Sequence, residues 1–200
     1  MKIIIVGGTG TIGSAVVKAL KTRHSLVIVG HQHGNFQVDI TDMASIEKMY
    51  HAIGHFDALI STTGQLHFGP FEEMTPSDHM RGINSKLMGQ INLVHAGLKQ
   101  INNHGSFTLT SGILSDDPIR FGASASMINA ALNGFVRGSA IEMPRGIRIN
   151  IVSPTVITES LESYGDFFRG YEPVPADKVA LAYCKSVEGL QTGQIYKSGW

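Results

Sequence analysis

The sequence predicts an α/β protein in which helices cover both faces of a doubly wound parallel sheet, giving three layers (α/β/α). Short β-branched runs alternate with stretches of helical spacing, and that alternation is typical of parallel strands joined by crossover helices. A chain of 200 residues that is 42% hydrophobic is long enough to bury one core. We therefore expect a single domain over residues 1–200.

The expected strands are short apolar runs bounded by turn-forming residues, at residues 2–6, 25–29, 35–38, 56–61, 106–110, 146–152 and 194–197. Between them, residues three and four positions apart suit one helical face, as in Ile91, Val94, His95 and Leu98, and again in Ile128, Leu132, Phe135 and Val136. Ligands of such sheets bind outside the carboxyl ends of the strands. The residues that follow each strand are therefore the candidates for a site.

A glycine-rich turn joins the first expected strand to an amphipathic helix. Its residues are Gly7, Gly8, Thr9, Gly10, Thr11, Ile12 and Gly13. Glycines spaced in this way permit a sharp turn, a close approach of bare backbone to a pyrophosphate, and tight seating of the helix on the strand. The helix N-terminus then faces the anion. The pattern predicts a Rossmann-type dinucleotide site, and the alternative is a turn that binds nothing.

The turn after the second expected strand favours NADP(H) over NAD(H). An NAD site usually places a carboxylate there, on the ribose 2′-hydroxyl, whereas this chain has His31 and His33 and no carboxylate. A carboxylate would repel a 2′-phosphate, and an imidazole tolerates it. The two histidines lack further ligands nearby in the sequence, so we expect solvated side chains and no metal site.

The overall charge and the single cysteine narrow the class of protein. Acidic and basic residues number 16 each, so nucleic-acid or membrane binding has no electrostatic footprint. Cys184 cannot form an internal disulfide, and a buried thiol in a reducing compartment is the simplest interpretation. No signal-like or membrane-spanning apolar stretch is present in the sequence. We expect a cytoplasmic protein that acts on a small molecule.

The chain resembles the short-chain dehydrogenase/reductase family over residues 1–200. The matching segments are residues 130–142, residues 146–154 and the stretch Thr192, Gly193 and Gln194. The resemblance implies contacts to the cofactor from Asp39, Ile40, Thr62, Thr63, Gly64, Pro154 and the backbone of Ile157. It also implies that Asn84 begins the long helix of the active site. The helices starting near Asn84 and Ala123 form oligomer faces in this family, which implies a homodimer or homotetramer.

The catalytic centre departs from the pattern of the family. A Tyr and a Lys four residues apart normally supply general acid/base chemistry, because the ammonium lowers the pKa of the phenol. Ala125 and Asn129 stand at those two positions, and Gly112 stands where the family has its Ser. Of the usual four residues only Asn84 is expected in place. Ser111, adjacent to Gly112, is a second catalytic candidate, with a strand-end cap as the alternative.

Four further features can be interpreted either as functional or as purely structural. Lys86 should point away from Asn84 and be a solvated surface lysine. His67 is a possible proton donor or a plain loop residue. The loop 115–121 and the aromatic segment 158–173, where the family has its substrate lid, can line a pocket or only pack.

These observations predict an NADP(H)-binding oxidoreductase with a non-standard active site, which reduces a small conjugated or carbonyl acceptor. Hydride transfer positioned by the fold can survive the loss of an acid, best for acceptors that delocalise the added electrons. The alternative is a non-catalytic NADP(H)-binding redox sensor or regulatory protein.

Overall fold

The computed structural model describes all 200 residues and contains one seven-stranded sheet. Every pairing between neighbouring strands is parallel, and the spatial order is β3-β2-β1-β4-β5-β6-β7. The strands are β1 (Lys2–Val6), β2 (Ser25–Gly30), β3 (Phe36–Gln37), β4 (Phe56–Ser61), β5 (Ile101–Thr110), β6 (Arg148–Pro154) and β7 (Ile195–Ser198). The order reverses between β1 and β4, which is the switch point where ligands bind in such sheets.

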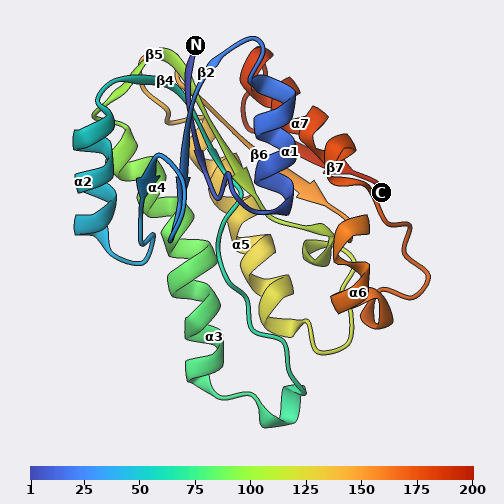
Figure 1. The fold of residues 1–200 in the computed structure, drawn as a ribbon. Coiled ribbons are helices and arrows are strands. Elements are labelled where there is room, and N and C mark those ends of the chain that lie inside the picture. Colours follow the sequence, from blue (N-terminus) through green and yellow to red (C-terminus); the bar gives the residue numbers. More distant parts are fainter.

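Helices cover both faces of this sheet (Figure 1). They are α1 (Thr11–Leu20), α2 (Met43–Ile53), α3 (Pro76–Gly82), α4 (Gly89–Gly97), α5 (Ala123–Ala140), α6 (Leu161–Tyr164) and α7 (Ala176–Glu188). A π-helical segment, Ile83–Met88, connects α3 to α4 without a break. None of the helices is both long and apolar enough to span a membrane.

A hydrophobic core lies on each face of the sheet, because side chains alternate in direction along the strands. On β1, Ile3 and Ile5 are buried beneath α1 and α7, whereas Ile4 and Val6 are buried beneath α2, α4 and α5. Successive side chains of a strand point to opposite faces, so a central strand covered on both sides is apolar throughout. The expected three-layer α/β/α fold is confirmed.

The expected strands are all present, with shifted ends. The largest shift is in β5, which begins at Ile101 rather than at Ser106. Ile101 is buried, but residues 102–104 are exposed and polar, so periodicity alone did not mark this part of the strand. Asp42 caps α2, accepting a hydrogen bond from the N–H of Ala44 at 3.0 Å, as its position before the helix predicts.

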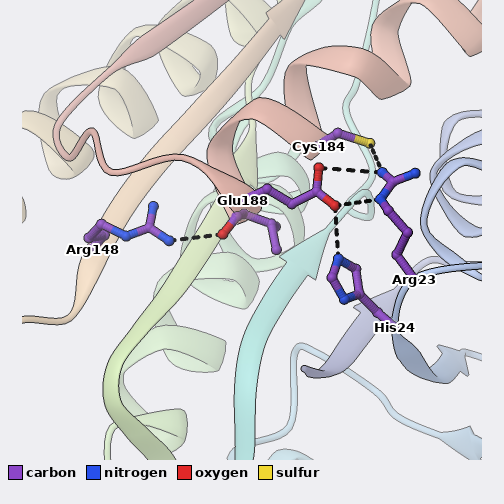
Figure 2. A network of polar contacts seen from close by, with 6 residues as sticks. Arg23, His24, Arg148, Cys184 and Glu188 are labelled. Carbon is purple, nitrogen blue, oxygen red and sulfur yellow. Dashed lines mark hydrogen bonds and ion pairs between the residues drawn. The ribbon is translucent and has the colours of Figure 1, made fainter.

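A polar network joins the turn that follows α1 to the end of α7 (Figure 2). Glu188 accepts from Arg23 Nε at 2.8 Å and lies 2.9 Å from His24 Nε2. These contacts hold the pKa of Glu188 below its usual value, chiefly through the hydrogen bond from Arg23. Cys184 is buried beside this pair, and its burial raises the pKa of the thiol. The network fastens the C-terminal helix over the N-terminal βα unit.

Candidate active site

The site lies at the carboxyl ends of β1, β4, β5 and β6, and the glycine turn forms one wall of it. Gly7 has φ +83°, and a Cβ there would come within 2.7 Å of the carbonyl oxygen of Thr62. A Cβ on Gly13 would overlap the carbonyl of Gly7. Both glycines are therefore required by the packing of the turn. Gly10 differs, because its Cβ would meet nothing closer than the Gly7 carbonyl oxygen at 3.4 Å.

The N-terminus of α1 is free to bind an anion. Gly10 occupies the N-cap position without a side-chain hydrogen bond, and the first turn holds no acidic residue. The backbone N–H groups of Thr11, Ile12 and Gly13 have no acceptor within the protein. Unsatisfied N–H groups and the helix dipole together attract a phosphate. The residues at this end of the sheet therefore fit the pyrophosphate of a dinucleotide.

A polar cavity of about 400 Å³ continues from the glycine turn past the end of β2. Its lining includes Gly7, His31, Asp39, Ile40 and Thr63. The side chain of His31 is exposed at its rim. Asp39 accepts from Thr41 Oγ1 at 2.6 Å and from the Thr41 N–H at 2.9 Å, and these two bonds lower the pKa of its carboxyl. No group of three His, Cys, Asp or Glu side chains is placed to hold a metal ion.

A second, mostly apolar cavity of about 490 Å³ lies next to the first. Gly64 and Gln65 line both cavities, so the two meet at the loop after β4. Apolar side chains from three segments complete the wall, namely Leu66, Phe68, Val156, Ile157, Tyr164 and Phe168. Phe68 and Tyr164 face each other with ring centroids 6.1 Å apart. The segment 158–173 thus contributes two aromatic rings to this cavity.

The backbone of Ile157 is available at the boundary of this cavity. Ile157 is buried and forms an isolated parallel bridge with Val174, in which Thr158 N–H and Val174 N–H are the donors. The N–H of Ile157 itself has no acceptor within the protein. A carboxamide oxygen is a suitable acceptor for such a group. Pro154, the last residue of β6, is buried just before this turn.

The three positions that the resemblance assigns to the Ser, Tyr and Lys of the family, namely 112, 125 and 129, lie at the end of β5 and on the first turns of α5. A Cβ on Gly112 would lie 3.2 Å from Asn129 Nδ2, so positions 112 and 129 are neighbours. Ala125 is fully buried and packs with Ile113 and Leu114. Ser111 and Asn129 are 3% and 2% exposed, and Ser111 Oγ and Asn129 Oδ1 lack hydrogen-bond partners. Buried polar atoms are normally paired, so these orphans fit a site that receives a ligand or water.

Lys86 corrects one expectation, because it is buried rather than solvated. Its side chain is 8% exposed, and Nζ donates to the carbonyl oxygen of Ser111 at 3.0 Å. Asn84, on the opposite side of the π-helical segment, is exposed. The two residues do point in opposite directions, but the inward one is Lys86. The catalytic role of Asn84 stays a prediction, and the structure gives its side chain no contact with the site.

The other candidates take more modest places. His67 Nε2 lies 3.9 Å from Asp78 Oδ1 and thus faces α3. Ser115, in the loop after β5, accepts from Asn133 Nδ2 at 3.0 Å, so this loop is tied to α5. Tyr171 packs edge-on against Phe168 with centroids 5.3 Å apart and supports the aromatic wall from behind.

Gln90 is a buried residue of this site that the sequence analysis missed. Its amide accepts from the Thr110 N–H and donates to the Thr110 carbonyl, both at 2.9 Å. The same Nε2 lies 3.1 Å from the carbonyl of Lys86. Gln90 therefore clamps the lysine-bearing segment to the end of β5. The available signal was its spacing, four residues after Lys86 on one helical face.

Comparison with known proteins assigns this arrangement to a family. A profile described as "Enoyl-(Acyl carrier protein) reductase" matches residues 11–180. The protein lin1944 from Listeria innocua has a crystal structure with a TM-score of 0.97 and 51% identity, covering 98% of each chain. A small-chain dehydrogenase solved in complex with NADPH has a TM-score of 0.89 and 25% identity, covering 98% of this chain and 95% of its own.

Curated relatives are more distant in sequence. An uncharacterized oxidoreductase of Methylorubrum extorquens is 25% identical over 81% of this chain and 75% of its own length. A hydroxynaphthalene reductase of Aspergillus fumigatus is 24% identical over 74% of this chain and 56% of its own. The profile match covers well over half of the chain, and the glycine turn, the switch point and the neighbouring cavities agree with it. The chain therefore belongs to the short-chain dehydrogenase/reductase family of NAD(P)-dependent oxidoreductases.

Proposed function

We propose that this protein is an NADPH-dependent reductase of a small acceptor with an apolar, conjugated body. The observation that carries the proposal is the junction at Gly64 and Gln65, which line both the polar groove and the apolar cavity. A dinucleotide in the groove supplies hydride, and the apolar cavity holds the acceptor beside it. Contact between the two reactants accounts for a large part of the rate in such a reaction.

The chemistry of the two cavities supports the choice of cofactor and acceptor. His31 at the rim of the polar groove leaves room for a 2′-phosphate, and the NADPH complex of the small-chain dehydrogenase agrees with it. The rings of Phe68, Tyr164 and Phe168 favour a flat acceptor. The name of the Aspergillus relative denotes a fused aromatic substrate, which supports the same class. Ala125 offers no acid to a localised alkoxide, so quinones and enones are preferred over simple ketones.

The test is the oxidation of NADPH against a panel of acceptors that contains quinones, flavins, enones and simple ketones. We expect turnover with at least one conjugated acceptor and rates about 10²–10⁴-fold lower for a simple ketone of similar size, the range that a positioned acid contributes. Gly10→Val serves as the inactive control, because it blocks the anion site without disturbing the turn. NADPH binding without oxidation by any acceptor would contradict the proposal.

A second candidate function is a non-catalytic NADP(H)-binding sensor. It is favoured by the burial of Ala125 among Ile113 and Leu114, which leaves nothing that titrates at the usual acid position. For a sensor, NADPH changes the oligomeric state or the affinity for a partner, and no acceptor is reduced. Sedimentation with and without NADPH, run beside the acceptor panel, separates the two functions.

We also propose that the chain forms a homodimer or homotetramer in the cytoplasm. The helices expected to form the interface carry the exposed apolar side chains of Met88 and Met127. Exposed apolar side chains on neighbouring helices favour an interaction surface. A monomeric sedimentation coefficient at micromolar concentration would contradict this part of the proposal.

A further inference from the structure

Lys86 is a buried ammonium that reaches the end of β5. Its Nζ donates to the Ser111 carbonyl oxygen at 3.0 Å, and its side chain is 8% exposed. Its stem lies against Gly64, where a Cβ would come within 2.6 Å of the Lys86 Cα. Gly64 lines both the polar groove and the apolar cavity. The stem of Lys86 therefore packs against the backbone at Gly64, where these two cavities meet, although Lys86 itself lines neither of them.

The charge of Lys86 has no counter-ion within the protein. None of the ion pairs includes it, and burial alone accounts for the lowering of its pKa to about 8. The titratable groups on the helices packed against the segment contribute nothing to that shift; they are Asp78, His79, Arg81, His95 and Arg137. Burial of a charge without an opposite charge beside it is costly, and groups perturbed in this way are candidates for functional roles.

The surroundings of Lys86 are the positions that the missing catalytic residues would occupy. Ser111, whose carbonyl holds the ammonium, precedes Gly112, and Gly112 adjoins Asn129. Ser111 Oγ and Asn129 Oδ1 are buried without partners. A cation and two unpaired polar atoms thus gather where the family has its Ser and Lys. The cation comes from the helix that contains the π-helical segment, instead of from α5.

We propose that Lys86 is the proton donor of this active site. It lies on the π-helical segment between α3 and α4, whereas the Tyr and Lys that supply the proton elsewhere in the family lie on α5. The proposal rests on the reductase function above and names the group that completes its reaction. Hydride addition leaves the acceptor as an enolate or phenolate anion. The N–H bond of the Lys86 ammonium then breaks, an O–H bond forms on the acceptor oxygen, and the neutral amine regains a proton from water.

The order of these two transfers agrees with the preference for conjugated acceptors. The Lys86 ammonium, held at the Ser111 carbonyl, gives its proton to the delocalised anion after hydride transfer, whereas the Tyr of the family bonds the carbonyl oxygen during that transfer. Protonation of a phenolate, whose conjugate acid has a pKa of about 10, by an ammonium of lower pKa is downhill. Lys86 thus supplies the proton in a chain that has Ala125 where the family has the phenol of a tyrosine.

The kinetic test compares Lys86→Met, Lys86→Arg and the exposed-lysine control Lys18→Met on α1. With a conjugated acceptor, kcat of the wild type falls as the pH rises through about 8, where the ammonium is lost. Lys86→Met lowers kcat by about 10²–10⁴-fold and removes this pH dependence. Lys86→Arg keeps the positive charge but loses kcat to a similar extent, with a flat pH profile, because guanidinium does not release its proton to the acceptor. Lys18→Met behaves as the wild type.

A second measurement is independent of turnover. Competitive acetylation, followed by mass spectrometry, reports the reactivity of each lysine as a function of pH. Lys86 should titrate near pH 8 and be protected when NADPH and a product-like phenol are bound, whereas these ligands should not change the reactivity of the exposed Lys18. Lack of protection at Lys86 would overturn the proposal, because a proton donor must lie against the bound acceptor.

The outcomes separate this proposal from the function on which it rests. A wild type that reduces no acceptor refutes both. A wild type that is active, with a folded Lys86→Met variant of equal kcat and unchanged pH profile, refutes the role of Lys86 alone. The role of Lys86 is also refuted if Lys86→Met loses activity while Lys86→Arg keeps the pH profile of the wild type. In that case the lysine acts only through its packing.

Discussion

Substitution of Gly10 by Val tests the anion site at the N-terminus of α1. The new Cβ makes an ordinary contact at 3.4 Å with the Gly7 carbonyl oxygen, and we expect the valine methyl groups at this N-cap position to keep a phosphate from the N–H groups of Thr11 and Ile12. Each of these groups can donate a charge-assisted hydrogen bond worth about 1.5–3 kcal/mol to a phosphate. Loss of both weakens NADPH binding by about 3–6 kcal/mol, which is about 10²–10⁴-fold in Kd.

Titration calorimetry of NADPH measures this loss, and thermal unfolding measures the integrity of the fold. Valine is a poorer N-cap than glycine, so we expect a decrease in stability of about 1 kcal/mol and a fall in Tm of about 2–4 °C. Gly138→Ala, on an exposed part of α5 with nothing within 4 Å of the new Cβ, is the matched control and should bind NADPH as the wild type does. A Gly10→Val protein with wild-type affinity would refute the placement of the pyrophosphate.

Two further predictions concern charge. His31→Asp should reverse the preference for NADPH over NADH, because a carboxylate at the groove rim repels a 2′-phosphate and can accept a hydrogen bond from a ribose hydroxyl. Calorimetry with both cofactors measures this preference. An unchanged ratio of the two affinities would contradict the prediction. For Lys86, the pKa is lowered from 10.5 to about 8 on folding, so the buried charge destabilises the fold most below about pH 8 and ceases to do so as the pH approaches 10.5. The free energy of unfolding of the wild type should therefore rise by about 3 kcal/mol relative to Lys86→Met between about pH 7 and pH 10.5 in urea titrations, and a constant difference would show that the lysine is not desolvated.

The sequence predicted the sheet well because its signals are local. The strand runs and the glycine turn each depend on a few adjacent residues, and both appear, with strand ends shifted by up to five residues. The inward position of Lys86 could not be derived in the same way. The sequence shows that residues 84 and 86 face opposite sides of a helix, but not which side packs on β5. That choice depends on the contacts of Gln90 with Thr110 and of Gly64 with Lys86, which join residues distant in the chain.

The expected helix at this place also hid a π-helical segment. A π-turn has one more residue than an α-turn, and such segments are frequent at functional sites. Ile83–Met88 adopts this form within a helix that is otherwise regular from Pro76 to Gly97. The α-helical spacing of apolar residues cannot reveal the π-helical segment, because the extra residue shifts that spacing by only one position.

The contact between Gly64 and Lys86 limits which residues position 64 can tolerate among homologues. Gly64 has φ +116° and no space for a Cβ, so any side chain there would push the lysine-bearing helix away from the loop after β4. A single exchange at this position would then disturb cofactor affinity and the proton supply together, whereas changes at Gly10 or at Lys86 disturb one of them alone. The clash would be with the Cα and Cβ of residue 86, which every residue except glycine carries, so we expect homologues to keep glycine at 64 whatever side chain stands at 86.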